Sequence, residues 1–215
     1  MEVVGFFWYG LAASVVFLVG VLACIQGFSG MKQEPFSFLN HFISELGDPR
    51  FAKHKTLFAV TMIATGILMV PFILGLGLTF NSTLGNVVMG LGLFCVISCV
   101  LVGFFPEHKV KTHFAVSGCF FVGMILLIIS FTITIALEPT PAFPTWVILA
   151  SIVALGVISS FIIDTVILPK WELNMTNEPW AWENGRPRFW LNPFLEWWAF
   201  FALVGWLLMV VILSF

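Results

Sequence analysis

Carboxylates and imidazoles are the side chains of this sequence best suited to chemistry, and they come from four separate stretches of the chain. With one serine, the candidate site residues are His41, Ser44, Glu45, Asp48, Glu107, His108, His113, Asp164 and Glu196. Such side chains can transfer protons, bind a divalent metal or hold the polar group of a ligand. All but His41 and Ser44 are therefore candidate ligand-binding residues.

The closest spacing among the candidates is that of His41 and Glu45, which are one turn apart if their segment is helical. A carboxylate in that position can hydrogen-bond to the imidazole and raise its basicity. With Ser44 and His113 they are the candidate catalytic residues, and His41, His108 and His113 are the candidate metal ligands. No HExxH or GxSxG motif appears, which favours a role without catalysis. No cofactor is predicted, and a divalent metal is the alternative.

The composition determines which elements must position these residues. Hydrophobic residues make up 60% of the chain and charged residues 9%, and the mean hydropathy is +1.06. A soluble domain of this length could not bury so much apolar surface, so the surrounding solvent must be lipid. Runs of about 20 apolar residues predict membrane-spanning helices. The runs cover residues 4–24, 57–78, 85–105, 114–136, 146–168 and 193–213. The predicted fold is all-α, one domain over residues 1–215.

The first connection is predicted to contain an amphipathic helix at the membrane interface, over residues 35–46. Phe38, Phe42 and Leu46 follow one another at helical spacing, and the polar side chains fall on the other face. Gly47 would end this helix. A helix in this place can turn its polar face toward the mouth of the bundle. A solvated interfacial helix with no site explains the same pattern.

The basic residues predict the orientation of the spans. All nine follow the first, third or fifth span: Lys32, Arg50, Lys53, Lys55, Lys109, Lys111, Lys170, Arg186 and Arg188. Positive loops face the cytoplasm, so both termini are expected outside a multi-pass protein of the cell membrane. Long connections would also collect charge by length alone. Tryptophans within residues 169–192 predict anchoring at headgroup depth, with a lid over a pocket as the alternative.

In this topology the candidate residues all reach the cytoplasmic boundary, and the opposite face has only Glu2 and Glu138. A carboxylate inside a span usually faces a partner or a polar cavity, and Asp164 and Glu196 are of this kind. A structural ion pair would also account for them. A pocket at this depth meets headgroups on one side and water on the other, so membrane lipid is the expected partner. A net charge of −2 argues against nucleic acid, and the sequence identifies no protein partner.

Three short motifs resemble those of a prokaryotic six-span membrane family of unknown function. They are His41-Phe42-Ile43-Ser44-Glu45-Leu46-Gly47, Gly103-Phe104-Phe105-Pro106 followed by His113, and Glu196-Trp197. That family is similar to the eukaryotic group with the DRAM autophagy modulators and the FRAG-type proteins of lipid remodelling. The resemblance implies six helices, a membrane location and dealings with lipid, and it supplies no established reaction. The chain has Glu45 where the eukaryotic members have aspartate.

Three functions fit these observations. The first is a protein that binds or organises lipid through a polar pocket at the cytoplasmic leaflet, which requires no catalysis by these residues. The second is an intramembrane lipid hydrolase or transferase that uses histidine and carboxylate chemistry. The third is a proton-coupled transporter or an accessory subunit of a membrane complex, although the ionisable residues gather at one interface instead of crossing the bilayer.

Overall fold

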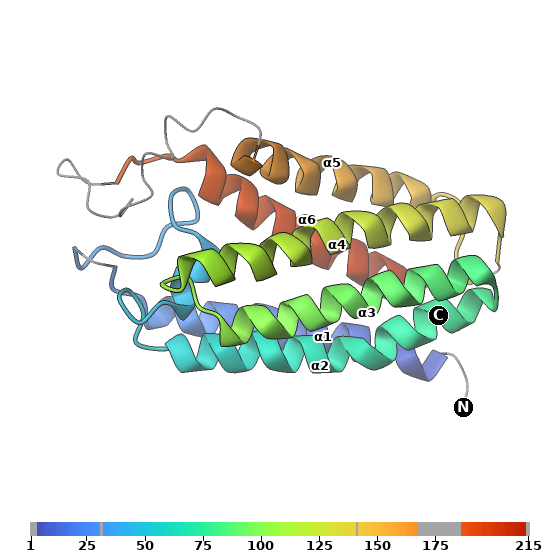
Figure 1. Cartoon of the computed structure of the whole chain (residues 1–215), viewed down its shortest axis with the longest axis horizontal. Coiled ribbons are helices and arrows are strands. Elements are labelled where there is room, and N and C mark those ends of the chain that lie inside the picture. The colour runs from blue at the N-terminus through green and yellow to red at the C-terminus, as the bar shows by residue number, and fades with distance from the viewer. Residues whose placement is uncertain (1–3, 31, 141, 167–185, 214–215) are drawn as a thin grey trace.

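Six long helices build the chain, as a computed structural model shows (Figure 1). The structure describes residues 4–30, 32–140, 142–166 and 186–213. The helices are α1 (Val4–Gln26), α2 (Lys55–Phe80), α3 (Thr83–Phe104), α4 (Val110–Leu137), α5 (Val147–Val166) and α6 (Leu191–Leu213), and the short 3₁₀ helix η1 covers Ile43–Gly47. All six long helices are apolar enough to cross a membrane, and the described residues contain no strand. This confirms the all-α, six-span fold.

The helix ends differ from the expected spans by at most four residues. Local chemistry explains where the turn between α2 and α3 begins and ends. Asn81 takes the left-handed conformation, with a φ of 47°, and ends α2. Ser82 then caps α3, because its side chain accepts a hydrogen bond from the Gly85 amide at 3.1 Å.

The six helices form a closed ring, in which each helix contacts the next along the chain and α6 contacts α1. The first connection, the α3–α4 turn and the start of α6 all lie at one end of the bundle, on the left in Figure 1. We call this the loop end; its described residues are 27–30, 32–54, 105–109 and 186–190. The two termini lie toward the opposite end. Every described basic residue therefore belongs to the loop end or to the first turn of a helix that starts there.

The amphipathic helix expected over residues 35–46 does not form, and that prediction is wrong. Only η1 is helical in this stretch. Two amides where η1 begins bond to side chains and not to helical carbonyls. Phe42 N–H donates to the Glu45 carboxylate, and Ile43 N–H donates to the Glu196 carboxylate. All of η1 is buried, so η1 itself lacks the solvent-facing side that an interfacial helix would keep.

The first connection is closed at its base by short antiparallel pairing. Phe28 and Ala52 form an isolated bridge, and Lys53 N–H donates to the Gly27 carbonyl at 2.9 Å. These bonds bring the end of α1 close to the start of α2. We call the described residues between them, 29–30 and 32–51, the plug. Its helix η1 contacts α1, α2 and α6, and the side chains of His41, Glu45 and Asp48 are buried in it.

A candidate acidic site at the loop end

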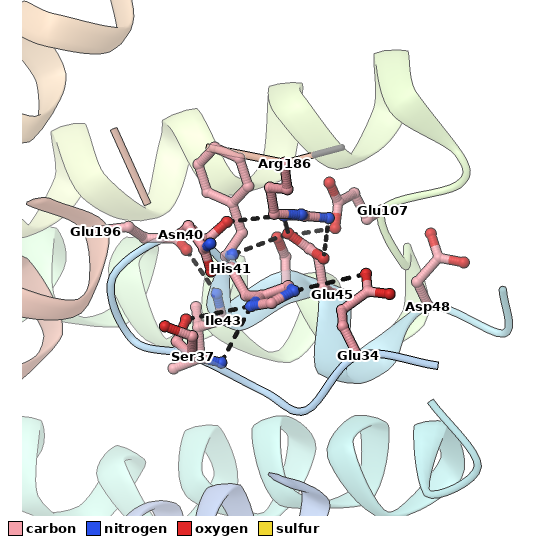
Figure 2. A network of polar contacts seen from close by, with 12 residues as sticks. Glu34, Ser37, Asn40, His41, Ile43, Glu45, Asp48, Glu107, Arg186 and Glu196 are labelled. Carbon is pink, nitrogen blue, oxygen red and sulfur yellow. Dashed lines mark hydrogen bonds and ion pairs between the residues drawn. The ribbon is translucent and has the colours of Figure 1, made fainter. Parts of the chain in front are cut away.

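Four carboxylates lie buried together at the loop end, and we call them the acidic cluster: Glu45, Asp48, Glu107 and Glu196. Their exposed fractions are 0%, 0%, 8% and 7%. Glu45 belongs to η1, Asp48 ends it, Glu107 lies in the α3–α4 turn and Glu196 lies in the second turn of α6. Asp48 is at one edge of the group in Figure 2. The structure thus brings together carboxylates from three separate parts of the sequence.

Glu45 is held by Arg186, which sequence reasoning used only for orientation. The guanidinium donates to both carboxylate oxygens, at 2.7 and 2.9 Å. It also donates to the Asn40 carbonyl at 2.8 Å (Figure 2). The Phe42 amide donates to Glu45 Oε1 at 2.9 Å. No spacing rule links residues so far apart, so the sequence contained no signal for this pair.

Asp48 has a cation of its own. Its Oδ1 accepts a hydrogen bond from the Arg50 amide at 2.8 Å, and the Arg50 guanidinium donates to both carboxylate oxygens. The side chain of Asp48 is fully buried, whereas that of Arg50 is 33% exposed. The pair therefore places one charge inside the plug and the other at its surface.

Glu107 and Glu196 have neutral partners instead. Ser44 Oγ donates to Glu107 at 3.2 Å, and the Ile43 amide donates to Glu196 Oε2 at 2.7 Å. Neither forms a salt bridge with another described residue. Burial raises the pKa of Glu107 well above its ordinary value of 4.5, and the neighbouring carboxylates raise it further, while Ser44 opposes the rise. The cluster thus has more acid groups than cations among the described residues.

His41 is buried in the plug, with an exposed fraction of 2%. Its Nδ1 accepts a hydrogen bond from the Ser37 amide at 3.0 Å, and Phe28 and Phe36 pack against the ring. Its Nε2 is 3.9 Å from Glu34 Oε1, too far for a hydrogen bond. Burial, followed by the charge of Arg186, lowers the pKa of His41 from 6.5 to about 4.

The expectation that Glu45 would orient His41 and increase its basicity is therefore wrong. Arg186 occupies the carboxylate of Glu45, and the imidazole faces Glu34. Ser44 donates to Glu107 and not to a histidine. The three residues are neighbours in the chain, yet they do not form a base and nucleophile set in this structure.

The other two candidate histidines belong to the α3–α4 turn and to the start of α4. His113 is buried in the first turn of α4, where its Nδ1 is 2.8 Å from the Phe105 carbonyl. His108 is exposed in the preceding turn. In the described ranges no three histidine, cysteine or acidic side chains are arranged to hold a metal ion. The structure thus does not bring the three candidate metal ligands into one group.

Asp164 pairs with α6 and not with the cluster. The Asn192 side-chain amide donates to Asp164 Oδ2 at 2.8 Å and to Thr165 Oγ1 at 2.9 Å. The bond links the end of α5 to the start of α6. A neutral amide is the partner here, where the sequence suggested an ion pair with a histidine or lysine as one alternative.

The segment before α6 fastens the plug to the bundle. Asn40 donates to the Pro187 carbonyl at 2.6 Å, and the Trp190 amide donates to the Leu39 carbonyl at 2.9 Å. Trp190 also packs edge-on against Phe42. The part of residues 169–192 before Arg186, for which anchoring or a lid was expected, lies outside the described residues.

Comparison with known proteins identifies a family for this chain. A family model described as "Protein of unknown function (DUF998)" matches residues 11–213. No curated protein and no solved structure matches the chain. The match reaches from within α1 to the end of α6 and includes the acidic cluster, and the chain therefore belongs to the DUF998 family of proteins of unknown function.

Proposed function

We propose that this protein binds or organises membrane lipid through the acidic cluster. The observation that supports the proposal is the burial of Glu107 and Glu196 without a cationic partner among the described residues. An isolated buried carboxylate is unfavourable unless it is neutralised or paired. A ligand that supplies positive charge or hydrogen-bond donors would relieve this. At the ends of spanning helices, a lipid headgroup is the nearest source of such groups.

The sign of the cluster specifies the class of headgroup. Two of its four carboxylates are paired with arginine, which leaves Glu107 and Glu196 to act on a ligand. A primary or quaternary ammonium would be attracted, and an unshielded phosphate or carboxylate would be repelled. We therefore expect an amine-bearing lipid to be preferred over an anionic one. The resemblance of the first-loop motif to the DRAM and FRAG-type proteins agrees with a role in lipid handling.

The loop end is proposed to face the cytoplasm of a cell membrane, with both termini outside. The support is the distribution of basic residues, which lie at this end of the bundle wherever the structure describes them. The acidic cluster would then lie at the inner leaflet. Reporter enzymes fused to either terminus would test this orientation independently of any lipid.

Proton-coupled transport is the second candidate, and one observation favours it. Burial raises the pKa of Glu107, so this carboxylate would exchange a proton nearer neutral pH than an exposed glutamate does. Lipid hydrolysis or transfer has less support, because the Ser44 hydroxyl donates to Glu107 and His41 Nδ1 accepts from the Ser37 amide. Proton uptake by liposomes that contain the protein, absent in Glu107→Gln, would favour the transporter.

Native mass spectrometry of the purified protein tests the lipid proposal. The protein would be offered equal amounts of phosphatidylethanolamine and phosphatidylglycerol in mild detergent. We expect retention of phosphatidylethanolamine by the wild type and loss of that preference in Glu107→Gln and Glu196→Gln. Glu138→Gln, at the other end of α4, is the matched control. Unchanged retention in the two folded cluster variants, or a preference for phosphatidylglycerol, would contradict the proposal.

A further inference from the structure

An apolar cavity lies inside the ring of helices, separate from the acidic cluster. Residues of α1, α2, α3, α4 and α6 line it, and its volume is about 70 Å³. One water needs about 10–15 Å³ of such space, so the cavity exceeds a single water several times over. Protein interiors are packed to near-crystal density, and a void of this size is uncommon in them. We therefore expect a ligand to fill the cavity.

The residues that line the cavity indicate the chemical class of its ligand. Carbon and sulfur atoms dominate the lining, which includes the flexible side chains of Met62 and Met69 on α2 and of Met124 on α4. Methionine adapts its shape to irregular apolar partners. Cavities with such walls stay dry and take up apolar molecules. Hydrocarbon is thus the matching chemistry.

The lining also contains one hydroxyl with no partner among the described residues. Thr65 is among the lining residues, and its Oγ1 is buried with no hydrogen-bond partner among the described residues. The other hydroxyl of the lining, that of Ser14, donates to the Gly10 carbonyl at 3.0 Å. A hydroxyl left unpaired within a membrane bundle is unfavourable. Thr65 can therefore give one hydrogen bond to an otherwise apolar ligand.

An aromatic layer stands between the cavity and the acidic cluster. Phe200 is one turn beyond Glu196 on α6, and its ring stacks between Phe17 at 5.4 Å and Phe120 at 5.9 Å. In the other direction the lining includes Leu203 and Val204, which are only half-buried. The cavity wall therefore continues toward the lipid-facing surface of α6 and is closed toward the loop end.

We propose that this cavity binds one hydrocarbon chain that enters from the bilayer. The chain comes from a membrane phospholipid or from a free fatty acid, and both present the same apolar chemistry to the walls. The aromatic layer makes this site independent of the acidic cluster. The cavity would bind its ligand whether or not the cluster holds a headgroup.

Quenching of tryptophan fluorescence by brominated chains tests the proposal. Trp206 lines the cavity, is 3% exposed and donates to Ser151 Oγ at 3.0 Å. The emission lost in Trp206→Phe identifies its signal. We expect dibromostearic acid, or phosphatidylcholine with a dibrominated chain, to remove most of this signal and to saturate. Quenching by the free acid alone assigns a fatty acid, and quenching by both assigns a lipid chain.

Two filling variants complete the test. Ala13→Leu on α1 and Thr65→Leu on α2 enter the cavity from different helices, so one serves if the other fails to fold. Both should protect the Trp206 signal, while Gly90→Ala, whose added methyl meets no atom within 4 Å, should not. Absence of saturable quenching in the wild type, or equal quenching in a folded filling variant, would overturn the proposal. Loss of headgroup preference in Glu107→Gln would leave it intact.

Discussion

Arg186 and Glu45 are 141 positions apart in the chain and form a two-point salt bridge at the loop end. Their side chains are 9% and 0% exposed. The bridge fixes the segment before α6 to the 3₁₀ helix of the first connection. It also neutralises one member of a group of four buried carboxylates.

Replacement of Arg186 by alanine should destabilise the protein strongly. Removal of one partner leaves the other charge buried and unpaired, which costs about 3–5 kcal/mol in comparable pairs. Arg186→Lys should be milder, because lysine keeps the charge but loses the two-point geometry. Denaturant unfolding in detergent measures the change. Arg188→Ala is the control, since Arg188 is exposed. Equal stability of the two alanine variants would refute this view of the bridge.

Glu196 should hold the first connection through its hydrogen bond to the Ile43 amide, and not through its charge. Glu196→Gln keeps an acceptor oxygen, whereas Glu196→Leu leaves a buried amide unpaired at about 1–3 kcal/mol. Hydrogen exchange at Ile43 should therefore be faster in the leucine variant and nearly unchanged in the glutamine variant. Similar exchange in both variants would show that the bond does not hold the loop.

Glu107 should make the protein less stable as the pH rises. Its pKa is raised in the folded state, so the folded protein binds the proton more tightly than the unfolded chain does. Its contribution to the free energy of unfolding is greatest below pH 4.5, the ordinary pKa of a glutamate. This contribution declines as the pH rises toward the pKa of Glu107 in the folded protein. Thermal unfolding across this range should show the decline in the wild type and a flatter profile in Glu107→Gln. Parallel profiles would contradict the assignment.

His41 should act in the opposite sense. Its pKa is lowered from 6.5 to about 4 in the folded state, so the unfolded chain binds the proton more tightly. Stability should therefore fall as the pH drops from 6.5 toward 4, by roughly 3 kcal/mol in total. Glu34 and Arg186 are the charged groups that face the ring. His41→Gln should remove most of the fall, and a fall of the same size in that variant would place its origin elsewhere.

The membrane fold could be predicted from the sequence because each span satisfies its own backbone. Length and hydropathy locate such helices without any knowledge of their neighbours. Consecutive spans cross the membrane in opposite directions, so every second connection lies at the same end. This topology alone predicts that Glu107 and Glu196 lie at the level of Glu45.

The contacts within the site depend on long-range geometry that no local pattern contains. Residues 35–46 have helical spacing, yet carboxylates from η1 and from α6 take up the amides of Phe42 and Ile43. The partner of Glu45 is Arg186 and not the nearby His41. Asp164 is a carboxylate within a span, as a site residue would be, but it accepts a hydrogen bond from Asn192. In each case the sequence identifies a polar group and only the fold selects its partner.

Mapping of a photo-crosslinked lipid tests the central claim most directly. A phosphatidylethanolamine analogue with a photoreactive group beside its amine would be activated with the protein in a bilayer, and the labelled peptides identified. We predict labels on η1, the α3–α4 turn and the first turns of α6, with loss of these labels in the Glu107→Gln, Glu196→Gln double variant. Labels spread over the outer helix surfaces, and equal in wild type and double variant, would contradict a headgroup site at the acidic cluster.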